Sequence, residues 1–239
     1  TYWVRYDHGS GSDAFGYGPA VENTRTLFSV ARDAGVPRFV HVSVANARED
    51  SSWEYFSGKA LLERDLAASG MSHAIVRPTI VFGGEANVFI NNIAWMLRRF
   101  PVFGVFGFGR ARVTPIHVRD VARICIDSGL SSDNVTIDAG GPETFTFREM
   151  VAGIARGLGI RRLILPMPRP VVLSVGWLLG KALDDVVITR HEISGLDDEL
   201  MYVPGPPLGV IKFGDSIADE RATLGKRYRN DLAHRIARA

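Results

Sequence analysis

The sequence RFVHVS at residues 38–43 and the sequence YFSGK at residues 55–59 decide the predicted fold. The first is a short run rich in β-branched and aromatic residues, which is typical of a strand buried in a parallel sheet. The sequence GVP at 35–37 stops the amphipathic segment before it, so we expect a helix over residues 20–34. Helical periodicity resumes afterwards and predicts a second helix over residues 53–68.

The same alternation of strands and helices extends outward from this stretch. Residues 73–77 read as a strand after the second helix, and residues 1–4 read as a strand before the first. Strands and helices that alternate with short connections favour a doubly wound parallel sheet of the Rossmann type. We therefore predict an α/β fold.

The pattern changes after Pro78, where proline-rich turns and short strands separate more closely spaced helices. This mixture predicts a smaller carboxyl-terminal lobe. The aromatic and glycine-rich residues 91–110 are expected to be a core helix followed by a turn. Helices are expected near residues 87–99, 117–129, 147–158, 169–184 and 217–224, and strands at residues 112–118 and 134–139.

The composition excludes several classes of protein. The 239 residues are 46% hydrophobic and 23% charged, which excludes disordered and fibrous chains. The net charge is only +2 and the basic residues are spread along the chain, so no nucleic-acid partner is expected. No apolar run reaches the ~20 residues of a membrane-spanning helix. The nearest, at 171–180, is expected to be a buried or groove-lining helix, with membrane-surface contact as the alternative.

The single cysteine and the histidines give no sign of a metal site. Cys125 lies in an apolar run, so we expect its side chain to be buried. As the single cysteine it cannot form an internal disulfide, which fits a reducing compartment, and we expect the protein to be cytoplasmic. The six histidines show no spacing of metal ligands, and all except His8, which could contact substrate, are expected to be structural or exposed. No metal ion is therefore expected.

Tyr55 and Lys59, with Ser43 at the end of the preceding strand, carry the strongest chemical signal. Residues four apart share a helix face, so the tyrosine hydroxyl and the lysine ammonium are expected to point into one cleft. A nearby cation lowers a tyrosine pKa from ~10 toward neutrality, which suits proton exchange with a substrate hydroxyl or carbonyl. Ser43 would hydrogen-bond the same oxygen, at the sheet edge where ligands bind.

A tyrosine and a lysine at this spacing also occur by chance on a solvated helix face. Here the pair opens a helix that lies between a strand ending in Ser43 and a strand ending in Arg77 and Pro78. This context favours a functional site over a solvated face.

These residues resemble the short-chain dehydrogenase/reductase superfamily in its extended, epimerase/dehydratase-like form. Ser43, Tyr55 and Lys59 match the catalytic triad of that superfamily. The sequence RPTIVFG at 77–83 looks like the segment that lies against the nicotinamide. The resemblance covers about residues 1–160.

Two further segments carry the resemblance, and one spacing refines it. Residues 21–43 are similar to a helix and strand of the superfamily. Residues 114–124 are similar to its later motif with a substrate-lobe aspartate, here Asp120, for which stabilising the helix start is the alternative. The short distance from serine to tyrosine resembles the atypical branch, which includes the nucleotide-binding accessory subunit of respiratory complex I.

The resemblance implies an NAD or NADP cofactor and a small-molecule substrate, such as a sugar nucleotide, with a reacting hydroxyl or carbonyl. Tyr55 would act as general acid/base, Lys59 would lower its pKa and hold the nicotinamide ribose, and Ser43 would orient the reacting oxygen. The implied cofactor-binding residues are Tyr55, Lys59, Arg77, Pro78, Thr79 and Ile80. The residues expected to contact substrate are His8, Asn91, Asn92 and Arg112, with Arg110 as the alternative to Arg112.

The resemblance also implies a domain division and a partner. Residues 1–160 would form a partial NAD(P)-binding domain with interleaved substrate-lobe segments, and residues 161–239 a mostly helical substrate lobe. Helices 20–34 and 53–68 are expected to form the interface of a homodimer. The glycine-rich dinucleotide fingerprint is absent from the sequence, so about 60 residues in two strand–helix units are expected upstream.

Three functions stay open at this point. The first is an NAD(P)-dependent epimerase, dehydratase or reductase, which the intact Ser43, Tyr55 and Lys59 favour. The second is an accessory subunit that binds a nucleotide without catalysis. The third is an inactive fragment that lacks the glycine-rich loop. The sequence does not choose between NAD and NADP.

Overall fold

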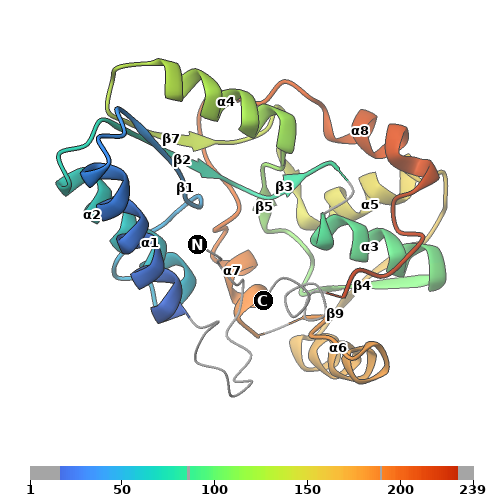
Figure 1. Cartoon of the computed structure of the whole chain (residues 1–239). Helices are drawn as coiled ribbons and strands as arrows, with labels where there is room; N and C mark the ends of the chain where they lie inside the picture. The colour runs from blue at the N-terminus through green and yellow to red at the C-terminus, as the bar shows by residue number, and fades with distance from the viewer. Residues whose placement is uncertain (1–16, 85–86, 189, 231–239) are drawn as a thin grey trace. The chain divides into compact units, whose positions relative to one another are not determined.

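A computed structural model of the chain describes residues 17–84, 87–188 and 190–230. The strand predicted over residues 1–4 and the predicted substrate residue His8 lie outside the described residues. The predicted α/β fold is confirmed, because parallel strands alternate with helices along the chain (Figure 1).

Two compact units divide the described chain. The first holds the residues up to Pro78 together with Val121–Ala139, and the second holds Thr79–Asp120 and the residues from Gly140 onward. The chain therefore passes from one unit to the other at three places, whereas we expected one boundary at residue 160 with interleaved segments before it.

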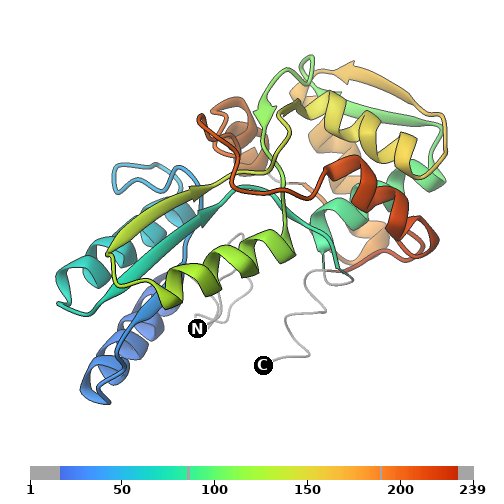
Figure 2. The same ribbon diagram turned by 90° about the horizontal axis from the view of Figure 1, so that it is seen from above.

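The first unit alternates helices and strands in the predicted order. Its elements are α1 (Tyr17–Asp33), β1 (Phe39–Val42), α2 (Glu54–Ala68), β2 (His73–Pro78), the part of α4 (Val118–Leu130) from Val121 onward, and β7 (Val135–Ala139). The three strands form a parallel sheet in the order β1-β2-β7 (Figure 2). In its register Val42 lies beside Val76, and Pro78 lies beside Ala139.

Helices cover both faces of this sheet. Because alternate side chains of a strand point to opposite faces, β1 contacts a helix on each side. On β1, Phe39 and His41 pack edge-on against Phe28 of α1. Val40, between them, faces Gly129 of α4. Apolar side chains one turn apart on α1 and α2 fill the space over the first face. This core contains Val21, Phe28, Ala31, Leu62, Leu66, Met71 and Ile75.

The second unit consists of short strand pairs and helices. Its strands are β3 (Val81–Phe82), β4 (Val102–Phe106), β5 (Arg112–Val113), β6 (Ile116–His117), β8 (Phe145–Thr146) and β9 (Leu163–Met167). Its helices are α3 (Val88–Arg99), α5 (Phe147–Gly157), α6 (Arg169–Leu183), α7 (Arg190–Asp197) and α8 (Phe213–Asp219), with a 3-10 turn at Glu220–Ala222. The pairs β3-β6 and β4-β9 are parallel, and β5-β8 is antiparallel.

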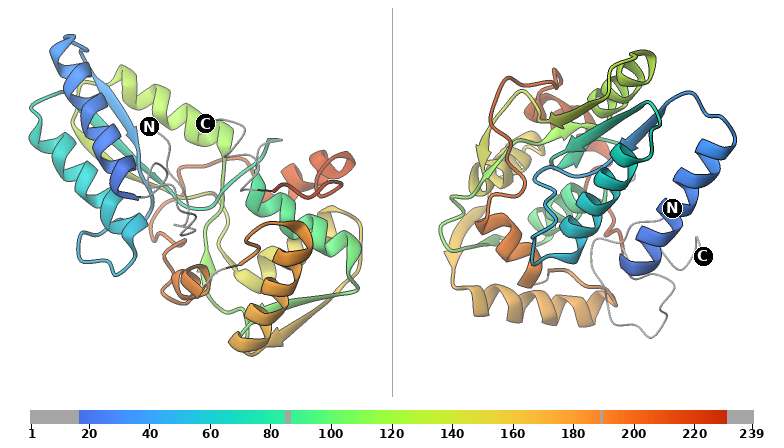
Figure 3. Two further views of the ribbon diagram at one scale, coloured as in Figure 1. Left: turned by 60° about the horizontal axis from the view of Figure 1, so that its bottom comes forward. Right: turned by 90° about the vertical axis from the view of Figure 1, so that its left-hand side faces the viewer.

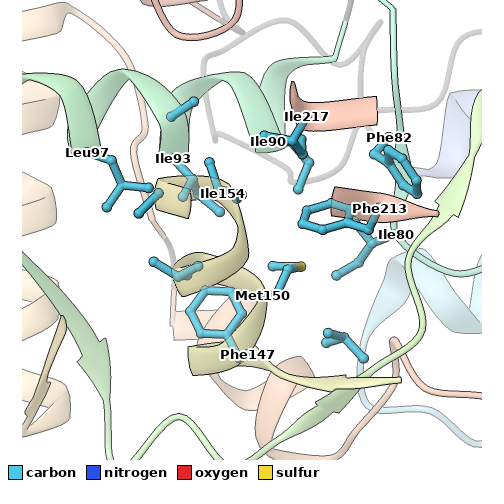
Figure 4. Close-up of a cluster of buried hydrophobic side chains, with 14 of the residues drawn as sticks. Ile80, Phe82, Ile90, Ile93, Leu97, Phe147, Met150, Ile154, Phe213 and Ile217 are labelled. Carbon is cyan, nitrogen blue, oxygen red and sulfur yellow. The ribbon is translucent and has the colours of Figure 1, made fainter. Parts of the chain in front are cut away.

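A second core lies among α3, α5 and α8 (Figure 4). The helix α5 begins with a capping box, in which the Thr146 hydroxyl accepts from the Glu149 N–H and the Glu149 carboxylate accepts from the Thr146 N–H. Its apolar residues then recur at helical spacing and enter the core. The largest fully buried side chains include Phe82, Ile90, Leu97, Met150, Ile154, Phe213 and Ile217.

Two predictions about strands need correction in this unit. Residues 102–106 form β4 instead of a turn, and β4 can pair with β9 because Gly104 leaves room for Met167. A Cβ at Gly104 would lie 2.5 Å from the Met167 sulfur. The strand expected over residues 112–118 is divided into β5 and β6, because Pro115 between them has no N–H to donate.

Two predictions about helices also need correction. The helix expected over residues 217–224 begins earlier, as α8, because Phe213 enters the second core. Residues 171–180 do form part of a helix, α6, but the buried position expected for them is wrong. Trp177 and Leu178 are 62% and 64% exposed.

We predict that Gly141→Ala destabilises the second unit. A Cβ at Gly141 would lie 1.8 Å from the Pro115 carbonyl oxygen, and backbone atoms cannot move aside as a flexible side chain can. Overpacking of this kind lowers the unfolding free energy by about 1–3 kcal/mol or more. Urea unfolding measures the change. Gly214→Ala in α8 is the control, because a Cβ there meets no atom within 4 Å. Equal stability of the two variants would contradict this packing.

Candidate active site at the ends of β1 and β2

Backbone pairing between β1 and β2 continues past the last residue of β1. The Ser43 N–H donates to the Val76 carbonyl at 2.7 Å, and the Ala45 N–H donates to the Pro78 carbonyl at 2.9 Å. Ser43 therefore lies beside the end of β2, at the carboxyl edge of the parallel sheet. Ligands of open α/β sheets bind at this edge.

Lys59 brings a cation to the same place from α2. Its side chain is buried, and its Nζ donates to the Val42 carbonyl at 3.1 Å, which is the peptide group that leads into Ser43. Burial lowers the pKa of Lys59 to about 8, although the negative charge of Glu63 opposes the shift. The ammonium thus keeps its charge at neutral pH while it is largely shielded from water.

Tyr55 lies one turn before Lys59, in the first turn of α2. The spacing of four residues places both side chains on one side of the helix, as predicted. The tyrosine ring is half-buried and makes edge contacts with the rings of Tyr17 and Phe56, at 6.4 Å and 5.4 Å between centroids. These contacts orient the ring of Tyr55 at the start of the helix.

The Ser43 hydroxyl is buried, and it has no hydrogen-bond partner among the described residues. Buried hydroxyl groups in proteins are nearly always paired, with protein or with an ordered water. A ligand oxygen at the sheet edge would satisfy this group. The Ser43 position therefore fits a substrate whose reacting oxygen accepts or donates one hydrogen bond.

His41, for which the sequence predicts a structural or exposed position, is a buried polar residue. It lies two residues before Ser43 on β1, so both side chains are expected on one face, and its Nε2 also has no partner among the described residues. Burial, and next the charge of Lys59, lower the pKa of His41 to about 3. The imidazole is therefore neutral at physiological pH. The sequence signal that could have placed His41 at the site is its position two residues before Ser43, since residues two apart on a strand share a face.

Arg77, a predicted cofactor residue, forms an ion pair that the sequence reasoning did not foresee. Its guanidinium binds both carboxylate oxygens of Glu63, with Nε at 3.0 Å and 3.1 Å, and lies 3.8 Å from Asp138. The hydrogen bonds to Glu63 raise the pKa of Arg77. Glu63 stands four residues after Lys59, so the repeat of Tyr55, Lys59 and Glu63 on one helix face was the available signal.

The segment after Pro78 continues in the second unit. The Thr79 hydroxyl donates to the Thr114 carbonyl, and the Ile80 carbonyl accepts from the Ile116 N–H at 2.9 Å. Ile80 also belongs to the second core. These contacts hold the backbone of the predicted cofactor segment, while its contact with a cofactor stays a prediction.

The asparagines predicted to face substrate hold the chain near residues 225–229. Asn91 accepts from the Gly225 N–H and donates to the Arg227 carbonyl, both at 2.9 Å. Asn92 donates to the Arg229 carbonyl and accepts from the Arg229 N–H, also at 2.9 Å. Their amides are thus engaged within the second unit, and a role toward substrate stays a prediction.

Two charged residues of the second unit are also engaged by its own groups. Arg112, predicted to contact substrate, binds the Glu199 carboxylate at 3.0 Å and stacks on the ring of Tyr202 at 4.0 Å. The Asp120 carboxylate accepts from the N–H groups of Val210 and Ile211, at 2.9 Å and 3.0 Å. Asp120 therefore fastens a later loop to the start of α4.

Curated proteins of two kinds are similar in sequence to the chain, whereas no family model matches it. The chain is 27% identical over 176 residues to the NADH-ubiquinone oxidoreductase 40 kDa subunit of Neurospora crassa, covering 72% of this chain and 45% of that protein. It is 31% identical over 162 residues to the NADH dehydrogenase (ubiquinone) 1 alpha subcomplex subunit 9 of Rattus norvegicus, covering 65% and 42%. It is 29% identical over 163 residues to the ceramide reductase of Caulobacter vibrioides, covering 66% and 50%. The chain spans about half the length of these relatives.

Solved structures share the fold at lower identity. The triphenylmethane reductase of Citrobacter sp. matches with a TM-score of 0.72 at 12% identity, over 92% of this chain and 75% of that one. The UDP-N-acetylglucosamine 4-epimerase of Methanobrevibacter ruminantium matches with a TM-score of 0.60 at 17% identity, over 93% and 74%. The resemblance to the short-chain dehydrogenase/reductase superfamily is confirmed. Ser43, which follows β1, and Tyr55 and Lys59, in the first two turns of α2, are the residues predicted to be the catalytic triad, and their catalytic role stays a prediction.

We predict that Lys59 makes the stability of the protein depend on pH above 8. The folded pKa is about 8 and the ordinary value is 10.5, so between these values the unfolded chain binds more protons. The unfolding free energy contributed by Lys59 therefore rises with pH across this window, by on the order of 3 kcal/mol. In Lys59→Met this contribution is absent.

The measurement is urea unfolding of the wild type and Lys59→Met at several pH values. The stability advantage of Lys59→Met at pH 7 should shrink steadily between pH 8 and 10.5. Lys212→Met, which removes an exposed lysine, controls for the general loss of a positive charge. A stability difference between wild type and Lys59→Met that stays constant with pH would show that Lys59 is not buried as described.

Proposed function

We propose that the whole protein is an NAD(P)-dependent oxidoreductase that acts on a hydroxyl or carbonyl group of a small molecule. The observation that carries this proposal is the buried, unpartnered hydroxyl of Ser43 beside the buried ammonium of Lys59. A purely structural strand end has no need for a buried cation, because burying an ammonium is unfavourable. A site for proton exchange does need one.

Each of the three residues has a distinct role in the proposed reaction. The Ser43 hydroxyl binds the reacting oxygen of the substrate and holds it near Tyr55. The Tyr55 hydroxyl gives a proton to that oxygen during reduction, or takes one from it during oxidation. Lys59 stabilises the phenolate form of Tyr55 by its positive charge, which it retains at neutral pH because its pKa is about 8.

The residues of this edge also fit a nicotinamide cofactor. Lys59 would hold the ribose, Tyr55 would lie beside it, and the backbone from Pro78 to Ile80 would lie against the nicotinamide ring. When bound, that group supplies or accepts the hydride. Because the Arg77 side chain is paired with Glu63, we propose that Arg77 contributes through its backbone and fixes the end of β2.

The comparisons support an oxidoreductase in general terms and leave its substrate open. The ceramide reductase of Caulobacter vibrioides is a reductase by name, and the triphenylmethane reductase of Citrobacter sp. has been solved with NADP(H). Epimerases of similar fold have been solved with NAD or with nucleotide sugars. We therefore propose NAD or NADP as the cofactor, without a choice between them.

A second candidate is an accessory subunit that binds a nucleotide without catalysis. It is favoured by the relatives from Neurospora crassa and Rattus norvegicus, which are subunits of NADH dehydrogenase by name. They are also mitochondrial by name, so a cytoplasmic location stays a prediction. The absorbance of reduced cofactor separates the two candidates, because only an enzyme consumes it when carbonyl substrates are added.

A homodimer through α1 and α2 also remains a proposal. The two helices pack together, and Arg25 of α1 binds Asp65 of α2 at 2.7 Å. Leu27 and Val30 of α1 are 43% and 59% exposed, which leaves apolar surface for a second copy. Light scattering by the whole protein tests this arrangement.

We predict that Tyr55→Phe abolishes turnover of the whole protein and leaves its affinity for NAD(P)H nearly unchanged. Phenylalanine keeps the ring contacts with Tyr17 and Phe56 but has no proton to transfer. A loss of general acid/base catalysis slows a reaction by roughly 10²–10⁴-fold. The decrease of reduced-cofactor absorbance with time measures turnover.

Tyr228→Phe is the matched control, because it removes only a hydroxyl that donates to Asp185 in the second unit. Its turnover should equal that of the wild type. If Tyr55→Phe also turns over at the wild-type rate, the proton-transfer role proposed for Tyr55 is wrong. If the wild type binds cofactor but never consumes it, the accessory subunit becomes the better function.

A further inference from the structure

The helix α6 is the most apolar exposed element of the second unit. Its sequence is RPVVLSVGWLLGKAL, and Gly176 and Gly180 are the buried residues of this helix. Those glycines allow a close approach to the next segment, since a Cβ at Gly176 would lie 2.3 Å from Ile188. Figure 1 and the right-hand view of Figure 3 show α6 at the edge of the second unit.

The exposed side chains of α6 gather on one face. Val171, Val175 and Leu178 follow one another at spacings of four and three residues, which places them on one stripe of a helix. They are 44%, 48% and 64% exposed. Trp177, at the flank of this stripe, is 62% exposed, and the Lys181 ammonium lies 4.1 Å from the centre of its ring. The face is therefore apolar with an amphipathic edge.

The charged residues of α6 and of the sequence before it have one sign. Residues 150–183 contain no aspartate or glutamate, and they contain Arg156, Arg161, Arg162, Arg169 and Lys181. Carboxylates return at Asp184, just after the helix, and Asp197 pairs with Arg169. The helix α6 itself carries Arg169 and Lys181 and no carboxylate, and the Lys181 ammonium beside Trp177 complements an anionic surface.

We propose that α6 lies on the surface of an anionic lipid bilayer, with its apolar face among the headgroups and upper acyl chains. Helices of this kind have an apolar face, a tryptophan, and lysine or arginine at the polar boundary. Long cationic side chains keep their charged ends in water while their stems cover apolar surface. No helix in the described part of the chain is long and apolar enough to cross a membrane, so α6 would lie along the surface.

This proposal goes beyond the proposed function and does not depend on it. The test is sedimentation of the 239-residue chain with vesicles of phosphatidylcholine alone and of phosphatidylcholine mixed with phosphatidylglycerol. We expect binding to the mixed vesicles, weaker binding at high salt because screening reduces charge attraction, and a blue shift of tryptophan fluorescence. Trp177→Phe should remove most of that shift.

The decisive variant combines Val175→Glu with Leu178→Glu, which places two carboxylates on the apolar face. Binding to the mixed vesicles should weaken at least roughly tenfold, because two exposed apolar side chains no longer enter the bilayer. The matched control combines Ile126→Glu with Leu130→Glu on α4, where both side chains are exposed as well. The control should bind like the wild type.

Several results would overturn the proposal. One is a folded wild type that does not bind the mixed vesicles, and another is binding that the α6 variant leaves unchanged. A third is a wild-type dimer that the α6 variant converts to a monomer without vesicle binding, which would make a second copy the occupant of this face. If the double variant does not fold, quenching of wild-type fluorescence by brominated lipids decides, and failure of quenching at Trp177 overturns the proposal.

Discussion

The hydrogen bond from the Lys59 ammonium to the Val42 carbonyl is the interaction on which the candidate site depends. It joins α2 to the end of β1 at the peptide group before Ser43, and it does so in a buried position where an ammonium needs a partner. One turn further along α2, Glu63 binds Arg77 and so joins the same helix to the end of β2. A single helix thus fixes a tyrosine, a cation and a carboxylate relative to two adjacent strands.

This arrangement separates the chemistry of the site from the polar residues of the second unit. Asn91, Asn92 and Arg112 belong to residue types that often bind ligands, yet their bonds go to the backbone and side chains of their own unit. Among the described residues, the buried side-chain nitrogen and oxygen atoms without a hydrogen-bond partner are His41 Nε2 and the Ser43 hydroxyl. The proposed reaction therefore depends on the sheet edge, and this edge fits both an enzyme and a subunit that retains a nucleotide.

Much of the first unit could be predicted, because its elements follow simple periodicity and because Tyr55 and Lys59 stand four residues apart on one helix. The sequence GVP at 35–37 predicted the end of the first helix at residue 34, and α1 ends at Asp33. Pairings between distant segments could not be predicted, since β4 and β9 are joined only through the room that Gly104 leaves for Met167. The ion pair of Glu63 with Arg77 was missed because it depends on the register of α2 against β2. The exposure of α6 was missed because an apolar helix reads as buried unless its surroundings are known.

The affinity of the whole protein for NADH and NADPH, compared between the wild type and Lys59→Met, shows whether the buried lysine belongs to a cofactor site. If Lys59 holds the cofactor, one of the two nucleotides binds the wild type and binds Lys59→Met at least roughly tenfold more weakly, as expected for a lost charged hydrogen bond. If neither nucleotide binds the wild type, or if a folded Lys59→Met binds as tightly, the buried lysine at the end of β1 is not part of a cofactor site.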